Sequence, residues 1–235
     1  MNIVEVRAQT LDEAIRTKQY DRAKTLLLEG IRIAEGKKHP GTVRQWDEKL
    51  LTIAETERAT NEIQRLTKLF AFDYRYFHRW KATFSPDEWA DEYRLLVERI
   101  RREEADQAKT RRPGRGYSAA DALLARLGPV LIKEKQWANL LELVQQAPRL
   151  DVLKGVLPHL AAPDPTEILA LFLPAIRSTA GQASTRPDYK NVATLLTLVR
   201  ENIVGSRPLT DVLIAELKAT FIKRSAMQEE LRAIN

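Results

Sequence analysis

The chain contains no cysteine, and this absence excludes more chemistry than any other feature of its composition. Without cysteine the protein can form neither a disulfide nor a thiolate metal site. Only three histidines are present, His39, His78 and His159, and no two of them have the His-x3-His spacing of a helical metal site. We therefore expect no bound metal and no other cofactor, and the lack of disulfides fits a reducing compartment.

Long apolar runs are also missing. No run approaches the roughly 18 residues that would make a transmembrane helix. The first residues, MNIVEVRAQTLDEAIR, carry acids early and lack the apolar core of a signal peptide. These two observations predict a cytoplasmic protein with no membrane partner.

The charges are numerous but nearly balanced. There are 38 basic and 32 acidic residues, which gives a net charge of +6 and a pI near 9.5. An acidic partner is compatible with this excess, but so is an ordinary solvated surface. A hydrophobic fraction of 44% with a charged fraction of 30% is typical of a folded, helical protein.

Every stretch longer than a loop has the apolar spacing of an amphipathic helix. The stripes include those formed by Ala23, Leu26, Leu27, Ile31 and Ala34; by Ile63, Leu66, Leu69 and Phe70; and by Leu209, Leu213, Leu217 and Phe221. Short breaks separate the helices into pairs, and KQYDRAKTLL at Lys18 has a faint echo in KQWANLLELV at Lys135. The pattern predicts an all-α fold of about a dozen helices in irregular hairpins, similar to tetratricopeptide repeats and arranged like an α-solenoid in two lobes.

The clearest helix start lies at Phe84-Ser85-Pro86-Asp87-Glu88-Trp89. Ser85 and Glu88 have the spacing of a capping box, Pro86 occupies the first helical position, and Phe84 and Trp89 have the spacing of a hydrophobic staple. The best candidate for a linker is KTRRPGRG at 109–116, which holds four cations, no acid and three helix breakers. We expect one helical lobe over 1–108 and a second over 117–235.

An ordered series of packing residues points to a known family. It comprises Ser85-Pro86-Asp87-Glu88-Trp89 with Arg94, Gln136-Trp137 with Leu140 and Leu143, Tyr189, Val192, Leu195 and Leu196, and then Leu213, Leu217, Lys223-Arg224, Ala226 and Glu230-Leu231. The series resembles the helical region that follows the zinc module in bacterial SWIM zinc finger proteins. The module itself needs Cys-x-Cys followed by Cys-x-His, so the resemblance carries over no metal ligand and no role of that module.

Nine of the sixteen aromatic residues fall between positions 70 and 93, with Arg75, His78, Arg79 and Lys81 among them. Two interpretations compete. The rings could stack on bases in a nucleic-acid groove, or they could fill a packed corner between helices. The staple already assigns Phe84 and Trp89 to packing. Between these extremes, Tyr74, Tyr76 and Trp80, with Arg79, are the candidates for lining a partner groove.

The linker offers the second candidate contact, through Arg111, Arg112 and Arg115 together with Lys109. These cations could bind phosphate or an acidic protein surface, or they could belong to a solvated linker. No phosphate loop, nucleophile motif or apolar pair of carboxylates is recognisable. The sequence therefore favours a non-catalytic scaffold that binds a protein partner, and the alternative is an accessory nucleic-acid-binding module.

Overall fold

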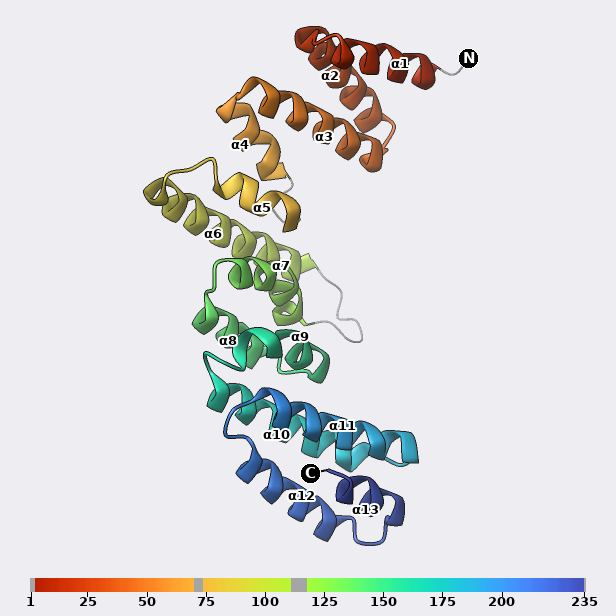
Figure 1. Cartoon of the computed structure of the whole chain (residues 1–235), viewed down its shortest axis with the longest axis vertical. Helices are drawn as coiled ribbons and strands as arrows, with labels where there is room; N and C mark the ends of the chain where they lie inside the picture. The colour runs from red at the N-terminus through yellow and green to blue at the C-terminus, as the bar shows by residue number, and fades with distance from the viewer. Residues whose placement is uncertain (1–2, 70–73, 111–117, 235) are drawn as a thin grey trace. The chain divides into compact units, whose positions relative to one another are not determined.

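The computed structural model describes the backbone of residues 3–69, 74–110 and 118–234, and the regular structure in these ranges is entirely α-helical. Side chains are described for residues 9–69, 76–109 and 118–234. Thirteen helices lie within the described ranges (Figure 1), so the all-α prediction is confirmed. Packing divides the chain into two units, Met1–Leu95 and Leu96–Asn235, and each is described by itself.

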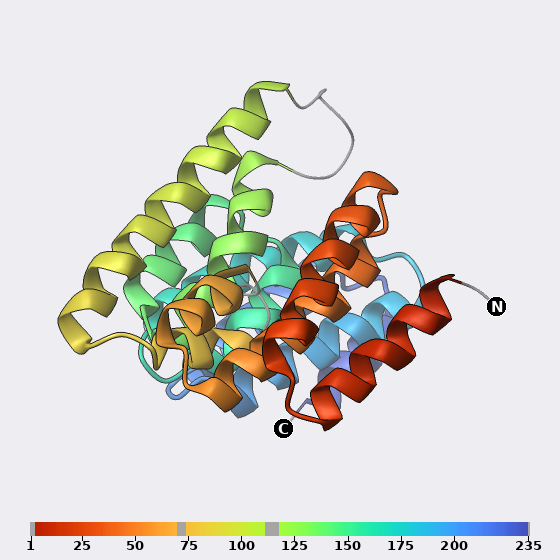
Figure 2. The same ribbon diagram turned by 90° about the horizontal axis from the view of Figure 1, so that it is seen from above.

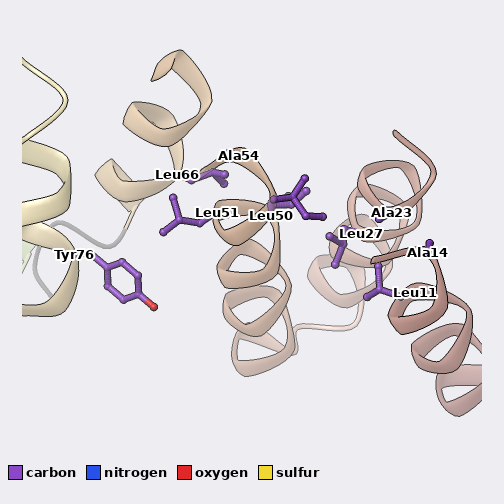
Figure 3. Close-up of a cluster of buried hydrophobic side chains, with 10 residues drawn as sticks. Leu11, Ala14, Ala23, Leu27, Leu50, Leu51, Ala54, Leu66 and Tyr76 are labelled. Atoms are coloured by element: carbon purple, nitrogen blue, oxygen red, sulfur yellow. The ribbon is translucent and has the colours of Figure 1, made fainter. Parts of the chain in front are cut away.

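Helices that are neighbours in sequence pack against one another in the first unit, α1 on α2, α2 on α3, α3 on α4 and α4 on α5. Their bounds are α1 Ile3–Arg16, α2 Tyr20–Gly36, α3 Pro40–Glu57, α4 Thr60–Leu69 and α5 Tyr74–Lys81. Figure 3 shows how buried leucines and alanines from successive helices meet in one cluster, with Leu11, Leu27, Leu51 and Leu66 each from a different helix. Burial of this shared apolar stripe is what holds neighbouring helices together.

The same turn recurs at four helix ends. Lys18, Lys38, Arg58 and Lys135 have φ values of 58°, 58°, 56° and 54°, which place them in the left-handed region. In each case the next residue donates its N–H to a carbonyl five residues earlier, as Gln19 does to Ala14 at 2.8 Å and His39 to Ala34 at 2.9 Å. This is a Schellman motif, which satisfies the last carbonyls of a helix and reverses the chain.

Three of these turns are evenly spaced. Lys18, Lys38 and Arg58 follow one another at intervals of 20 residues. The buried acceptors Ala14, Ala34 and Ala54 keep the same interval, because each lies four residues before the left-handed position. The first part of the chain is therefore built from segments of one helix and one turn. Lys18 and Lys135 open the two echoing stretches of sequence, and both occupy this turn.

Helix α6, Pro86–Thr110, is the longest of the described helices, with 25 residues, and appears in yellow-green in Figure 2. Its start has the predicted capping box, because the backbone N–H of Ser85 donates to Glu88 Oε2 at 2.8 Å and that of Glu88 donates to Ser85 Oγ at 3.4 Å. The staple is present as well, with the rings of Phe84 and Trp89 5.8 Å apart.

The second unit contains the rest of α6 and seven further helices. These are α7 Ala119–Lys133, α8 Trp137–Gln146, α9 Leu150–Leu160, α10 Pro165–Gln182, α11 Arg186–Asn202, α12 Arg207–Thr220 and α13 Ser225–Arg232. Sequence neighbours again pack together from α7 to α13, and near the end α10 also contacts α12 while α11 contacts α13. The two units divide between Leu95 and Leu96. The linker predicted at 109–116 remains a prediction, because 111–117 lie outside the described residues.

Two residues expected on buried stripes are exposed. Leu69, the last residue of α4, is 56% exposed, and Leu209 of α12 is 51% exposed. Both depart from prediction for the same reason. A helix turns by 100° per residue, so Leu69 lies well to one side of Ile63 and Leu66. Residues four apart on a helix are offset by about 40°, so the row that begins at Leu209 winds around α12. Leu213 and Leu217 of this row face the core, and Leu209 does not.

Candidate partner-binding surfaces

The aromatic residues that the structure describes between positions 76 and 93 form a packed cluster. Phe77 and Trp80 have no exposed surface, and Tyr76 and Trp89 are each 6% exposed. The ring of Trp89 meets Phe77 at 5.5 Å and Trp80 at 5.1 Å, both nearly perpendicular. Edge-to-face contacts of this kind are favourable between buried rings. The packed-corner interpretation therefore accounts for these four residues.

The burial of Tyr76 and Trp80 bears directly on their predicted role. Rings with 6% and 0% exposure present no face on which a base or a partner side chain could lie. Trp80 Nε1 is also buried and has no hydrogen-bond partner among the described residues. In this conformation Trp80 packs against Trp89 at the start of α6, and Tyr76 belongs to the buried cluster that α1–α4 share, so neither ring lines a groove.

Arg79 is the candidate of this group that remains at the surface. Its side chain is 41% exposed, forms an ion pair with Glu55 of α3 and lies 5.4 Å from the centre of the Tyr76 ring. These contacts tie α5 to α3, and they occupy much of the guanidinium. The side chain of Tyr74 and all of Arg111, Arg112 and Arg115 lie outside the described residues, so their predicted roles stay predictions.

The structure brings together a different group of residues in the first unit. A hollow of about 850 Å³ opens where the end of α2, the start of α3 and the end of α4 converge, and we call it the α3 groove. It is lined by Glu35, Lys38, His39, Pro40, Val43, Arg44, Asp47 and Leu69. Apolar side chains lie beside cations and anions, so the groove offers both apolar contact area and charges of both signs.

Electrostatics distinguish Asp47 within the α3 groove. Partial burial raises the pKa of its carboxyl above the ordinary value, while the nearby charge of Arg65 opposes the rise. Arg65 is engaged by Glu62, whose oxygens accept from its guanidinium at 2.6 and 2.9 Å. Asp47 is therefore a half-buried acid that a cation from a bound partner would stabilise in its charged form.

A second surface lies on α12 in the other unit. Four large apolar side chains in and beside this helix are exposed, Val204 at 87%, Leu209 at 51%, Val212 at 65% and Ile222 at 73%. We call the side of α12 opposite its buried residues, which carries Val212, Ala215 and Ala219, the α12 outer face. Scattered single apolar residues are normal on any protein, whereas a group of large ones in and beside one helix favours an interaction site.

Neither surface was identified from the sequence. Leu69 and Leu209 were expected on buried stripes, because periodicity alone does not show which side of a helix lies against its neighbours. The residues of the α3 groove are separated by up to 34 positions. They meet because the turn at Lys38 joins the end of α2 to the start of α3, and because α4, which carries Leu69, packs against α3. The exposed residues of α12 carried a usable signal in their heptad spacing.

Most of the excess positive charge falls in the predicted linker. Lys109, Arg111, Arg112 and Arg115 supply four positive charges with no acid between them, against a net +6 for the chain. Elsewhere, many cations bind acids on adjacent helices. Lys24 lies 2.5 Å from Glu57, and Arg177 bonds Glu216 through two contacts of 2.7 Å. Ion pairs of this exposed kind contribute little stability each but leave little unpaired positive surface around them.

No group of three or more histidine, aspartate or glutamate side chains that could hold a metal lies together among the residues that the structure describes. The described part of the chain likewise has no helix long and apolar enough to cross a membrane. Comparison with known protein families, with curated proteins and with solved structures gives no match to this chain.

Proposed function

We propose that this protein is a non-catalytic helical scaffold that binds a partner protein, and that the α3 groove is its contact surface in the first unit. The observation that supports this proposal most is the composition of the groove. Pro40, Val43 and Leu69 supply apolar surface, while Lys38 and Asp47 supply charges of opposite sign.

Such a surface suits a short amphipathic segment of another protein. An apolar side chain of the partner would lie against Val43 and Leu69, and flanking charges would meet Lys38 and Asp47. Apolar contacts would supply most of the affinity, and the charges at the rim would set orientation and speed of association. The groove is formed by helices that pack against one another, α2 on α3 and α3 on α4, so little ordering would be needed on binding.

The test is affinity capture from an extract of the source organism, followed by calorimetry with the purified partner. Val43→Glu places a charge in the groove, whereas Gln45→Glu places the same charge on an exposed position of the same helix. We expect Val43→Glu to weaken binding by about tenfold or more, which is 1.4 kcal/mol or more, and Gln45→Glu to bind as the wild type does. Equal binding by both variants, with equal helicity by circular dichroism, would remove the groove from the proposal.

The resemblance to SWIM zinc finger proteins belongs to the same proposal. The chain would be the accessory helical region of such a protein and would act without a metal of its own, in keeping with the absence of cysteine. A cytoplasmic location is also proposed, since a chain without disulfides suits a reducing compartment.

The alternative is nucleic-acid binding through the linker cations. The observation that favours it is the concentration of charge at Lys109, Arg111, Arg112 and Arg115. The burial of Trp80 and Trp89 removes the stacking surface that the aromatic residues would have offered. The alternative predicts binding of single-stranded oligonucleotides that weakens steeply with salt, and a change in the slope of about 0.7 for each cation removed. An absence of binding by the wild type at low salt would end this alternative.

A further inference from the structure

Helix α12 buries one face and exposes the opposite one. Thr210, Leu213, Ile214 and Leu217 are buried against α10, α11 and α13. Figure 1 shows α12 beside α13, beyond α10 and α11 from α9. On the other side lie Val212, Ala215 and Ala219, all of them exposed. The helix is thus apolar on both faces. An apolar face is expected where the helix packs against another element, so the second face is expected to be covered as well.

The spacing on the outer face is that of a coiled-coil seam. Val212, Ala215 and Ala219 are separated by three and then four residues, which corresponds to heptad positions a, d and a. In the same register the four buried residues fall at the b, c and f positions, on the side away from the seam. Pro208 occupies the preceding d position. Ile222 is seven residues after Ala215 and lies just beyond the end of the helix.

Charged residues flank the seam in a pattern that distinguishes the orientations of a partner helix. Asp211 and Lys218 both occupy g positions, seven residues apart, and Glu216 occupies the e position between them. In a parallel pair of identical helices, each g position meets the e position five residues later on the partner. That arrangement would place Asp211 against Glu216, two acids that each pair with an arginine of their own chain, and it would bring no acid of the partner helix to Lys218.

We propose that the α12 outer face binds a second copy of this chain, with the two α12 helices antiparallel about a two-fold axis near Ala215. In an antiparallel pair, g positions face g positions, so Asp211 of each copy lies beside Lys218 of the other. Isologous contact of this kind uses the same patch twice and closes at two subunits. The proposal is independent of the α3 groove.

The apolar side chains agree with the same alignment. Val212 of one copy packs over Ala215 of the other, where a small side chain leaves room for it. Val204, before the helix, and Ile222, after it, have the highest exposed fractions among the large apolar residues described. Val204 of one copy meets Ile222 of the other only when the two helices run in opposite directions. Asp211 also pairs with Arg200 of its own chain, so in the dimer its carboxylate lies between two cations.

The size of the surface sets the expected strength. Two helices of 14 residues with seams of small side chains form a contact at the low end of specific interfaces, for which roughly 1,000 Å² in total is the usual minimum. The dimer should therefore dissociate in the micromolar range, and sedimentation over a range of concentrations should resolve monomer and dimer.

Charge exchange provides the decisive experiment. In Lys218→Glu, Asp211 of each copy faces a glutamate, and in Asp211→Lys, each new lysine faces Lys218. We expect each variant alone to dimerise at least tenfold more weakly than the wild type, and an equal mixture of the two to recover dimerisation, because both contacts are then of opposite sign. Lys154→Glu on α9, which is exposed and remote from the seam, serves as the control and should dimerise normally.

A second readout uses the absence of cysteine. Ala215→Cys places one thiol in each copy next to the proposed axis, so mild oxidation should give a disulfide-linked dimer in high yield. Ala138→Cys, at another exposed alanine, should give none at the same protein concentration. A wild type that stays monomeric at high concentration, or a mixture of charge variants that dimerises no better than either alone, would overturn the proposal.

Discussion

The indole of Trp46 on α3 fills the space that a side chain at Gly30 on α2 would occupy. A Cβ atom at position 30 would lie 1.1 Å from Cζ3 of this ring and within 2.1 Å of two other ring carbons. Gly30 is buried in the middle of α2, where glycine costs helix stability. This cost is offset by packing between α2 and α3. Without a side chain at position 30, the helices approach closely enough for the ring of Trp46 to lie against the backbone of α2.

Gly30→Ala should therefore destabilise the first unit although alanine favours helices. The ring of Trp46 would have to move, and overpacking of this kind costs about 3 kcal/mol. Gly36→Ala in the same helix is the matched control, because nothing lies within 4 Å of its added Cβ, and it should be neutral or slightly stabilising. Urea unfolding followed by circular dichroism measures both. Equal stabilities for the two variants would contradict the close approach of α2 and α3.

At the left-handed turns, by contrast, a change to glycine should stabilise the protein. Lys38 has a φ of 58°, a conformation that costs a residue with a Cβ about 1–2 kcal/mol. Lys38→Gly relieves this cost, offset in part by the greater freedom of glycine in the unfolded chain, and should stabilise the protein by about 0.5 kcal/mol. Lys37→Gly, at a φ of −89°, should destabilise it by a similar amount. The difference in unfolding midpoint between these adjacent variants is the measurement.

The capping box of α7 predicts a dependence on pH. Hydrogen bonds from the backbone N–H and the hydroxyl of Ser118, both 2.8 Å long, lower the pKa of Asp121, and Arg149 adds to the effect. A lowered pKa means stability that is fully present above the ordinary carboxyl value near 3.8 and is lost as pH falls through the lowered value. Asp121→Asn should thus be less stable than wild type at pH 7, and the difference should shrink below pH 3.8.

Loss of the serine in this box should also lower stability at neutral pH. Ser118→Ala removes the acceptor that binds the Asp121 N–H at 3.1 Å, and such caps contribute about 1 kcal/mol. Ser178→Ala on the exposed face of α10 is the control and should change the unfolding free energy by less than about 0.5 kcal/mol. A difference of Asp121→Asn from wild type that does not vary with pH would show that the carboxylate is not held as described.

The aromatic cluster should respond in a graded way to changes at Trp80. Trp80→Ala leaves a large cavity and should cost about 3–5 kcal/mol. Trp80→Phe keeps part of the contact with Trp89 and removes an N–H that has no partner among the described residues, so it should cost about half as much or less. Thermal unfolding and near-ultraviolet circular dichroism distinguish the variants. If Trp80→Ala is tolerated, the ring is exposed in solution and its predicted role in partner binding returns.

The helices themselves were predictable from the sequence because their signals are local. Ser85, Pro86 and Glu88 fixed the start of α6 through groups within one turn of each other, and the structure has the expected hydrogen bonds. The all-α class follows from the same kind of signal, repeated along the chain. The arrangement of the hairpins as tetratricopeptide-like pairs stays a prediction.

What the sequence left undetermined depends on how helices face one another. Leu209 and Val212 look like core residues in isolation, and only the packing of α12 against α10, α11 and α13 shows that they point outward. The even spacing of Lys18, Lys38 and Arg58 was visible in principle, but these are common surface residues, and their shared role appears only from their left-handed backbone. The α3 groove lay beyond sequence reasoning for the same reason.

The regular interval between the first three turns constrains how such a chain can change length. One segment carries the polypeptide across the layer and the next carries it back, so removing a single segment would leave later helices in phase but running the opposite way. Removing two together would restore both phase and direction. Insertions and deletions in this region should therefore add or remove whole hairpins of two helices, although the segment that repeats in the structure is a single helix with its turn.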